Sequence, residues 1–212
     1  MSVSTTPRRY AVLVPVKPPA VGKSRLAGLD GDARHRLAEA FAQDTVLACL
    51  RADLVDQVLV VTDDAHFSQV LSALGCAAIP DGVSGDLNGT LRQAAAEALR
   101  RWPTLVPVAV CADLPALRPA DLDAVLAELP HDRPGFVPDA AGVGTTLYSA
   151  ATGDFDPHFG PGSRAAHLAA GADEMADAPA SVRRDVDDPA DLADAISLGL
   201  GPSTSLVRLQ LP

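Results

Sequence analysis

The feature of this sequence that most restricts its fold is an alternation of short apolar runs with helix-like segments. Four apolar runs stand out in the first half of the chain: Tyr10 to Pro15, Val55 to Val61, Cys76 to Ile79 and Val106 to Cys111. Such runs are typical of strands that are buried on both faces of a sheet. In the intervening segments, such as 33–50 and 91–102, apolar residues recur at the spacing of a helix. This alternation predicts an α/β fold, in which helices flank a mostly parallel sheet.

The remaining elements are predicted from the same periodicities. Further helices are expected at 66–74, 119–129, 164–170 and 189–198, and further strands at 135–137, 145–149 and 181–186. A length of 212 residues suits one α/β domain. We therefore expect a single domain over residues 1–212, with a core at about 10–198 and a tail at 199–212 that lies over the surface. Ligands of such sheets bind beyond the carboxyl ends of the strands, which selects the loops after residues 15, 61, 79 and 111.

The overall charge is acidic, with 17 Lys and Arg residues against 27 Asp and Glu residues and a net charge of −10. A protein that binds nucleic acid through its phosphates needs a basic face, so nucleic acid is not expected as a partner. No apolar stretch of about 18 residues is present, and residues 1–9 lack the apolar segment of a signal peptide. No membrane segment is therefore expected, and the cytoplasm is the expected location. The three cysteines, Cys49, Cys76 and Cys111, are odd in number and too widely spaced for a disulfide framework or a zinc motif.

The loop after the first apolar run reverses the sign of the charge. It holds both lysines of the chain, Lys17 and Lys23, together with Arg25 and no acidic residue. The Gly22-Lys23-Ser24 sequence suggests a P-loop, but that motif needs a glycine where Lys17 stands. What is left is a cluster of cations at the predicted ligand edge, where it can bind a triphosphate. A solvated basic loop is the alternative.

Two groups of aspartates lie at or near the ends of predicted strands. Asp113 comes directly after an apolar run, where one carboxylate can hold Mg²⁺, and a helix N-cap or turn is the alternative. Asp185 and Asp187 are two apart, so they face the same way if the segment is extended. Two such carboxylates repel each other unless a cation lies between them, and a solvated acidic turn is the alternative. Asp188, which precedes Pro189, is the better candidate for capping the last helix.

Three glycine-containing segments are candidates for binding an anion or a base. Gly160 and Ser163 lie in a Phe-Gly-Pro-Gly-Ser-Arg segment, where Ser163 is expected to cap a helix and the loop to bind a phosphate or carboxylate. Thr145 follows a Gly-Val-Gly sequence that permits a close approach of the backbone, and its hydroxyl can donate to an anion. The segment from Asp81 to Gly89 can wrap a flat base, with the Asp81 carboxylate accepting from guanine N1 and N2. Ordinary turns and a mobile surface loop are the alternatives.

Taken in order, these motifs resemble a known family. The Pro-Val-Lys and Gly-Lys-Ser-Arg-Leu segments resemble the start of GT-A-like nucleotidyltransferases, including molybdenum-cofactor and sugar-phosphate enzymes. Val-Thr-Asp-Asp, Cys-Ala-Asp-Leu-Pro, Gly-Thr-Thr-Leu and Phe-Gly-Pro-Gly-Ser follow in that order. The whole set spans about Tyr10 to Leu198. It resembles the 2-phospho-L-lactate / phosphoenolpyruvate guanylyltransferase family of coenzyme F-420 biosynthesis.

The resemblance implies a single-domain GT-A-like (Rossmann-like) nucleotidyltransferase fold with a central mixed, mostly parallel sheet between helices. GTP is then the donor, and phosphoenolpyruvate or 2-phospho-L-lactate is the acceptor. The implied site residues fall into four groups: Asp113, Asp185 and Asp187 for Mg²⁺; Thr145, Gly160 and Ser163 for the acceptor; Lys17, Lys23 and Arg25 for catalysis and the triphosphate; and Asp81, Gly82, Asn88 and Gly89 for the guanine. Arg164 is expected to face the acceptor because it is adjacent to Ser163.

In the implied reaction, a phosphate oxygen of the acceptor attacks the α-phosphorus of GTP, and pyrophosphate leaves. That oxygen is already ionised, so the lack of a convincing nucleophile–base pair in the sequence agrees with such chemistry. An Ala-, Arg- and Asp-rich, Lys-poor composition is typical of high-GC actinobacteria and favours phosphoenolpyruvate. The alternatives are a molybdenum-cofactor or sugar-phosphate nucleotidyltransferase and a non-catalytic GTP-binding module. The oligomeric state does not follow from the sequence.

Overall fold

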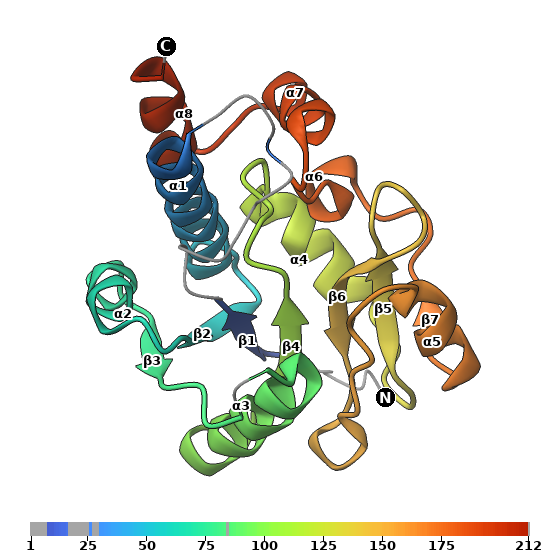
Figure 1. Cartoon of the computed structure of the whole chain (residues 1–212). Coiled ribbons are helices and arrows are strands. Elements are labelled where there is room, and N and C mark those ends of the chain that lie inside the picture. Colours follow the sequence, from blue (N-terminus) through green and yellow to red (C-terminus); the bar gives the residue numbers. More distant parts are fainter. Residues whose placement is uncertain (1–7, 17–25, 27–29, 84, 212) are drawn as a thin grey trace.

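Seven strands form the central sheet in the computed structural model, which describes residues 8–16, 26, 30–83 and 85–211. They are β1 (Tyr10–Pro15), β2 (Val55–Val61), β3 (Ala77–Ile79), β4 (Val106–Val110), β5 (Gly135–Pro138), β6 (Thr145–Ser149) and β7 (Asp173–Glu174). Their order across the sheet is β3-β2-β1-β4-β6-β5-β7. Neighbouring strands are parallel except that β6 is antiparallel to both β4 and β5. The prediction of a mixed, mostly parallel sheet is confirmed (Figure 1).

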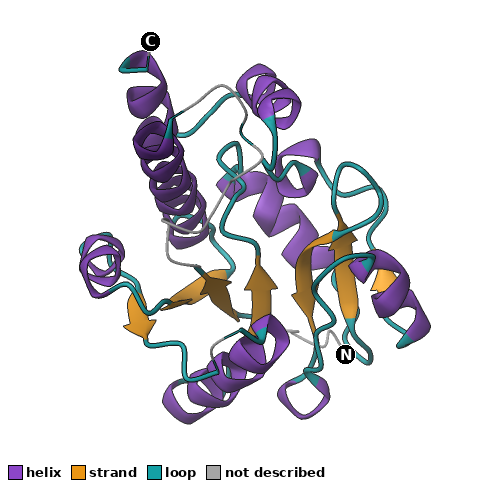
Figure 2. Cartoon of the chain, in the orientation of Figure 1, coloured by secondary structure: helices purple, strands orange, loops and turns teal. Residues whose placement is uncertain are grey.

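Helices cover both faces of this sheet (Figure 2). In chain order they are α1 (Gly31–Leu50), α2 (Ala65–Ser72), α3 (Leu87–Arg101), α4 (Pro119–Glu128), α5 (Ser163–Ala169), α6 (Ala180–Arg183), α7 (Pro189–Leu198) and α8 (Pro202–Leu209), with a 3-10 turn at Thr152–Asp154. The helices α1, α2, α4 and α6 pack on one face. The other face is covered by α3 and by the segment around Phe155. No described helix is long and apolar enough to cross a membrane.

The strand β1 contributes side chains to the apolar clusters on both faces of the sheet. The side chains of Val12 and Val14 point into the apolar cluster that includes α1 and α4, whereas Leu13 points into the cluster that includes α3. All three side chains are fully buried. Because successive residues of a strand face opposite sides, a strand covered on both sides must be apolar at every position. The continuous apolar run at Tyr10 to Pro15 has this cause.

The prediction of a strand at residues 181–186 is wrong. This segment contains the end of α6 and the loop that follows it. The hydroxyl of Thr146 in β6 donates to the carbonyl oxygen of Val182 at 2.7 Å, and the side chain of Val182 is buried in the apolar cluster on the sheet. Val182 therefore packs over a strand instead of joining the sheet, and its apolar character reflects that burial.

The tail expected to lie over the surface at 199–212 contains a helix within residues 199–211, which the structure describes. The helix α8 lies alongside α1 (Figure 1). The carboxylate of Asp44 in α1 accepts hydrogen bonds from the backbone N–H groups of Ser203 at 2.9 Å and Thr204 at 2.8 Å. Asp44 is 5% exposed, so α8 begins on a buried acidic group of another helix. The C-terminal segment is thus part of the packed fold.

Two helix starts bear on the site. Asp188 accepts from the N–H groups of Ala190 and Asp191 and caps α7, which confirms the predicted N-cap. The helix α3 begins at Leu87, four residues before the predicted start at residue 91. Its N-cap is Asp86, and the predicted base-binding residues Asn88 and Gly89 consequently lie in the first helical turn.

Candidate active site

Strand direction brings three segments to one edge of the sheet. Because β6 lies between β4 and β5 and runs the opposite way, β4 and β5 are parallel to each other. Asp113 and Asp139, which follow β4 and β5, therefore lie at the same edge as Thr145, which begins β6. The backbone N–H of Cys111 donates to the carbonyl oxygen of Thr146 at 2.9 Å at this edge. It is the carboxyl edge at which the sequence predicts ligand binding.

A backbone hydrogen bond joins the two groups of aspartates. The N–H of Val186 donates to the carbonyl oxygen of Asp113 at 3.0 Å, which places Asp185 and Asp187 beside the loop after β4. The sequence predicts a strand that ends at residue 186, but residues 185 and 187 lie in the loop between α6 and α7. Asp185 is partly buried there and Asp187 is exposed. The structure thus supplies the proximity that the sequence could not show.

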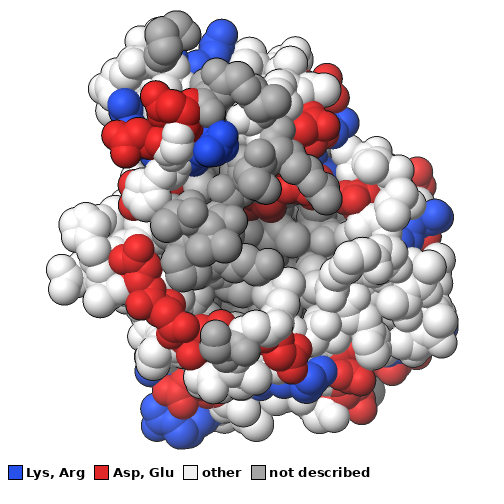
Figure 3. All heavy atoms as spheres, in the orientation of Figure 1, with Lys and Arg blue, Asp and Glu red and all other residues white. Residues whose placement is uncertain are grey.

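Negative charge is crowded around Asp185. Burial, followed by the neighbouring carboxylates of Asp113, Asp187 and Asp139, raises the pKa of Asp185 to about 7. Carboxylates that disfavour one another's ionisation in this way are stabilised by a cation. Figure 3 shows acidic side chains along the border of a hollow in the surface. The arrangement is therefore suited to a positively charged ligand.

The donor set fits Mg²⁺ only together with other ligands. Within the described ranges, no three Asp, Glu, His or Cys side chains form a ready metal-binding group. Mg²⁺ usually takes one or two protein carboxylates and completes its shell with water and substrate phosphates. One or two of the Asp113, Asp185 and Asp187 carboxylates, together with the phosphates of a nucleotide, would agree with that pattern.

The loop that carries Asp113 is held by three distant segments. The N–H of Leu114 donates to Thr45 Oγ1 in α1 at 3.1 Å, and the N–H of Gly201 donates to the carbonyl oxygen of Pro115 at 2.8 Å. The third contact is the bond from Val186 to Asp113. A backbone fixed in this way restricts the movement of the Asp113 side chain that it carries.

The predicted acceptor residues are connected through a buried histidine. Thr145 Oγ1 lies 3.0 Å from Nδ1 of His167 in α5, and Ser163 is the first residue of that helix. The N–H of Ser163 donates to the carbonyl oxygen of Gly160 at 3.1 Å. Gly160 has φ of +137°, a conformation that residues with a side chain rarely adopt. The structure therefore brings Thr145, Gly160 and Ser163 into one connected region.

One expectation about this segment is not met, and another stays a prediction. Ser163 does not cap α5, because Gly162 occupies the N-cap position in a left-handed conformation and no side chain caps the helix. The guanidinium of Arg164 is engaged by Glu174, with 3.0 Å between Nη2 and Oε2, and its Nη1 lies 3.4 Å from the carbonyl oxygen of Gly142, so a contact with the acceptor stays a prediction. Neighbouring residues on a helix project about 100° apart, so adjacency to Ser163 does not set the direction of Arg164.

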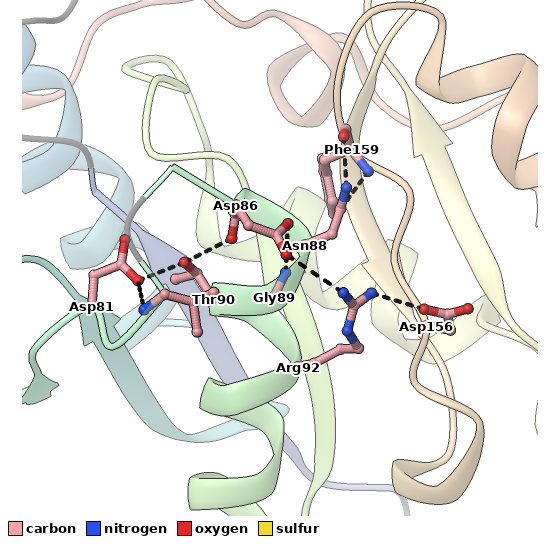
Figure 4. Close-up of polar contacts among 9 residues, drawn as sticks. Asp81, Asp86, Asn88, Gly89, Thr90, Arg92, Asp156 and Phe159 are labelled. Atoms are coloured by element: carbon pink, nitrogen blue, oxygen red, sulfur yellow. Dashed lines mark hydrogen bonds and ion pairs between the residues drawn. The ribbon is translucent and has the colours of Figure 1, made fainter.

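The predicted base-binding segment is ordered by its own contacts (Figure 4). The Asp81 carboxylate accepts from Thr90 Oγ1 at 2.6 Å and from the N–H of Val83 at 3.0 Å. A Cβ atom on Gly82 would lie 2.7 Å from Oε1 of Gln93. One on Gly89 would lie 2.4 Å from the N-cap carboxylate that precedes it. Close packing against the Asp86 carboxylate therefore accounts for glycine at position 89, whereas at Gly82 the flexible end of Gln93 can move aside, and binding of guanine stays a prediction.

Asn88 joins the base segment to the acceptor segment (Figure 4). Its Nδ2 donates to the carbonyl oxygen of Phe159 at 3.0 Å, and its Oδ1 accepts from the N–H of Phe159 at 2.7 Å. Both ends of the amide are thus used within the protein. Asn88 positions the residue that precedes Gly160, and its predicted contact with the nucleotide is untested.

The predicted triphosphate loop begins at Val16, the last described residue before the gap at residues 17–25. The N–H of Val16, directly after β1, donates to the carbonyl oxygen of Val61 at 2.8 Å, which keeps the chain at the carboxyl edge of the sheet. Lys17, Lys23 and Arg25 lie outside the described residues. Their roles stay predictions.

Two residues of this region were missed from the sequence. Asp139 adds to the charge around Asp185 and accepts from the N–H groups of Val143 at 2.9 Å and Gly144 at 2.7 Å. It follows an apolar run in the way that Asp113 does, so the same pattern could have found it. His167 carries no such signal, because a single histidine in a short helix has no distinctive spacing.

The sheet order and the helices on both faces define a GT-A-like fold, and solved structures share it. A crystal structure from Desulfovibrio desulfuricans G20, assigned to the nucleotide-diphospho-sugar transferases, matches with a TM-score of 0.68 and 20% identity and covers 95% of each chain. A 4-diphosphocytidyl-2C-methyl-D-erythritol synthase matches with a TM-score of 0.61 and 14% identity, over 90% of this chain and 99% of the other. At these identities the likeness shows the fold alone.

Sequence similarity shows the family. The family described as "Guanylyl transferase CofC like" matches residues 10–204. Phosphoenolpyruvate guanylyltransferases of Thermomonospora curvata and Streptomyces coelicolor are both 47% identical to the chain over 205 and 206 residues. Each alignment covers 96% of this chain, and 90% and 97% of the two relatives respectively. The chain belongs to this guanylyltransferase family and is a nucleotidyltransferase.

Proposed function

We propose that this protein transfers GMP from GTP to phosphoenolpyruvate and releases pyrophosphate. The observation that carries the proposal is the 47% identity, over 96% of the chain, to relatives named phosphoenolpyruvate guanylyltransferase. 2-Phospho-L-lactate is the second candidate acceptor, on the sequence resemblance. That resemblance also supports a role in coenzyme F-420 biosynthesis in the cytoplasm.

The chemistry needs positioning and charge neutralisation. A phosphate oxygen of the acceptor attacks the α-phosphorus of GTP, the bond from that phosphorus to the β-phosphate bridging oxygen breaks, and pyrophosphate leaves in line. The attacking oxygen is already ionised, so no side chain has to remove a proton from it. We assign Lys17, Lys23 and Arg25 to the triphosphate, Asp81, Gly82, Asn88 and Gly89 to the guanine, and Thr145, Gly160 and Ser163 to the acceptor.

Asp113, Asp185 and Asp187 are the residues that we propose hold Mg²⁺. Support comes from the crowding of their carboxylates around Asp185 and from the backbone bond that joins the two segments. When bound, the ion would offset the charge that develops on the phosphates. The protein's own contribution is to keep these carboxylates in place through the contacts of the loop after β4.

A pyrophosphate-release matrix tests the proposal. Four nucleoside triphosphates are each combined with phosphoenolpyruvate or 2-phospho-L-lactate, with and without Mg²⁺. We expect release only with GTP, Mg²⁺ and an acceptor, with phosphoenolpyruvate preferred. Asp113→Asn should lower kcat by at least ~100-fold, whereas Asp132→Asn, at a side chain that is 80% exposed, should leave it unchanged. Absence of release with both acids would refute guanylyl transfer to a three-carbon acid.

A further inference from the structure

His167 is a buried histidine that the reaction itself does not need. Its side chain is fully buried, and its ring stacks with Phe136 and Tyr148 at centroid distances of 5.2 and 4.8 Å, while Phe159 meets it edge-on at 5.6 Å. These contacts fix the plane of the ring. Both ring nitrogens nevertheless have polar partners, the Thr145 hydroxyl at Nδ1 and the backbone N–H of His158 at Nε2.

The partner of Nε2 determines the tautomer of the ring. The backbone N–H of His158 donates to Nε2 at 2.9 Å, and a main-chain N–H is always a donor. Nε2 must therefore be unprotonated, and the proton of the neutral ring is on Nδ1. Burial, and secondarily the nearby His158 imidazole, lowers the pKa of His167 to about 4, so the ring stays neutral at neutral pH.

The tautomer in turn sets the role of Thr145. Nδ1–H of His167 faces Thr145 Oγ1 at 3.0 Å, with the backbone of Ser163 as a further hydrogen-bond partner of the ring, so the Thr145 oxygen accepts and its own proton is directed elsewhere. Among the described residues, no hydrogen bond donated by the Thr145 hydroxyl is found. A buried hydroxyl that accepts on one side and has a proton to give on the other is a donor for an anion.

The same ring also places the loop that contains Gly160. By accepting from His158, it holds the backbone two residues before Gly160, and Asn88 holds Phe159 from the other side. The loop is therefore fixed by one imidazole and one amide from two different helices. Two parts of the predicted acceptor region, Thr145 and the 158–160 backbone, consequently share His167 as a common support.

We infer that His167 is a positioning residue for the acceptor: a neutral imidazole with its proton on Nδ1 that directs the Thr145 hydroxyl toward the anionic three-carbon acid. The inference rests on the proposed function, because it takes the acceptor to bind at Thr145 and Gly160. It adds a residue that acts on the acceptor through others and does not touch the reacting atoms.

The first test is the state of the ring. Long-range ¹⁵N–¹³C NMR of the histidine side chains in the free protein should show a protonated Nδ1 and an unprotonated Nε2 for His167. This state should persist at about pH 6, where an ordinary histidine is largely protonated. A proton on Nε2, or titration near the ordinary pKa of 6.5, would overturn the inference.

The second test separates the two bonds by substitution. The side-chain amide of Asn reaches the position of Nδ1, so His167→Asn can keep the bond to Thr145, whereas His167→Phe keeps the ring packing and loses both bonds. We expect His167→Phe to raise the acceptor KM by ~10-fold with little change in the KM for GTP, and His167→Asn to restore part of that loss. Thr145→Val should have a similar effect, and adding His167→Phe to it should cost little more.

His131→Ala is the matched control. It removes an exposed histidine from the loop before β5, at the edge of the sheet opposite the acceptor region. The acceptor KM of this variant should therefore equal that of the wild type. If the wild type is active and the acceptor KM is unchanged in both His167→Phe and Thr145→Val, the role of His167 is overturned and the proposed function is not. A wild type without turnover overturns the proposed function and this role together.

Discussion

Replacement of Asp44 tests how firmly the C-terminal helix is built into the fold. The carboxylate accepts from two N–H groups at the start of α8, of which that of Thr204 is buried and that of Ser203 is partly buried. An N-cap contributes ~1 kcal/mol to stability. A buried N–H left without an acceptor costs ~1–3 kcal/mol. The buried N–H of Thr204 should cost the full amount and the partly buried N–H of Ser203 a part of it. We therefore expect Asp44→Ala to lower the free energy of unfolding by about 2–3 kcal/mol.

Urea unfolding followed by circular dichroism measures this loss, with Asp64→Ala as the matched control. Asp64 caps α2 through a single bond from the N–H of Phe67 at 2.9 Å, so its removal should cost only ~1 kcal/mol. Asp44→Asn keeps the shape and one acceptor oxygen and should fall between the two. Amide hydrogen exchange in α8 should accelerate in Asp44→Ala and not in Asp64→Ala. A loss in Asp44→Ala no larger than in the control would refute the reasoning.

Three further predictions concern single side chains. Asn88→Ala should raise the acceptor KM, because both Asn88 bonds hold Phe159, and should also raise the KM for GTP, because Asn88 is assigned to the guanine; steady-state kinetics in which neither KM changes would contradict both roles. His167, with its pKa lowered to about 4, binds a proton more readily when unfolded, so its contribution to stability is complete above the ordinary pKa of 6.5 and declines toward pH 4 by at most ~3 kcal/mol. In urea unfolding over this pH range, the free energy of unfolding of His167→Phe should depend less steeply on pH than that of the wild type. An identical pH dependence would contradict the prediction. Thr204→Val should leave the free energy of unfolding equal or raise it by up to ~1 kcal/mol, because the Thr204 hydroxyl oxygen is buried with no hydrogen-bond partner in the described structure; a clear decrease in a denaturant melt would reveal a partner.

The central strands could be predicted because the apolar character of their residues follows from burial on both faces of the sheet. Every residue of β1 meets apolar side chains on one face or the other, so the run is apolar throughout. The prediction of a strand at 181–186 was wrong for a related reason. Val182 is buried against the sheet and Val186 against the cluster of α1 and α7, so both are apolar for two different packing reasons. Alternating burial of this kind gives a strand-like pattern without a strand.

The candidate site could be predicted one residue at a time but not as an assembly. Asp113 was identified because it follows a buried strand, and its relation to Asp185 depends on a hydrogen bond between segments that are distant in sequence. The link from Thr145 through His167 to His158 similarly depends on how α5 folds back on β6. Local patterns contain no information about such contacts, because they form only when the whole sheet is in place.

The two outer strands of the sheet bear on how the protein behaves at high concentration. An exposed edge strand offers unpaired N–H and C=O groups to other chains and can nucleate aggregation. Here β3 has three residues and β7 has two, Asp173 and Glu174, whose carboxylates are paired with Arg133 and Arg164. A strand this short and charged gives an incoming chain little to pair with. The charged side chains of β7 thus disfavour edge-to-edge growth of the sheet on this side.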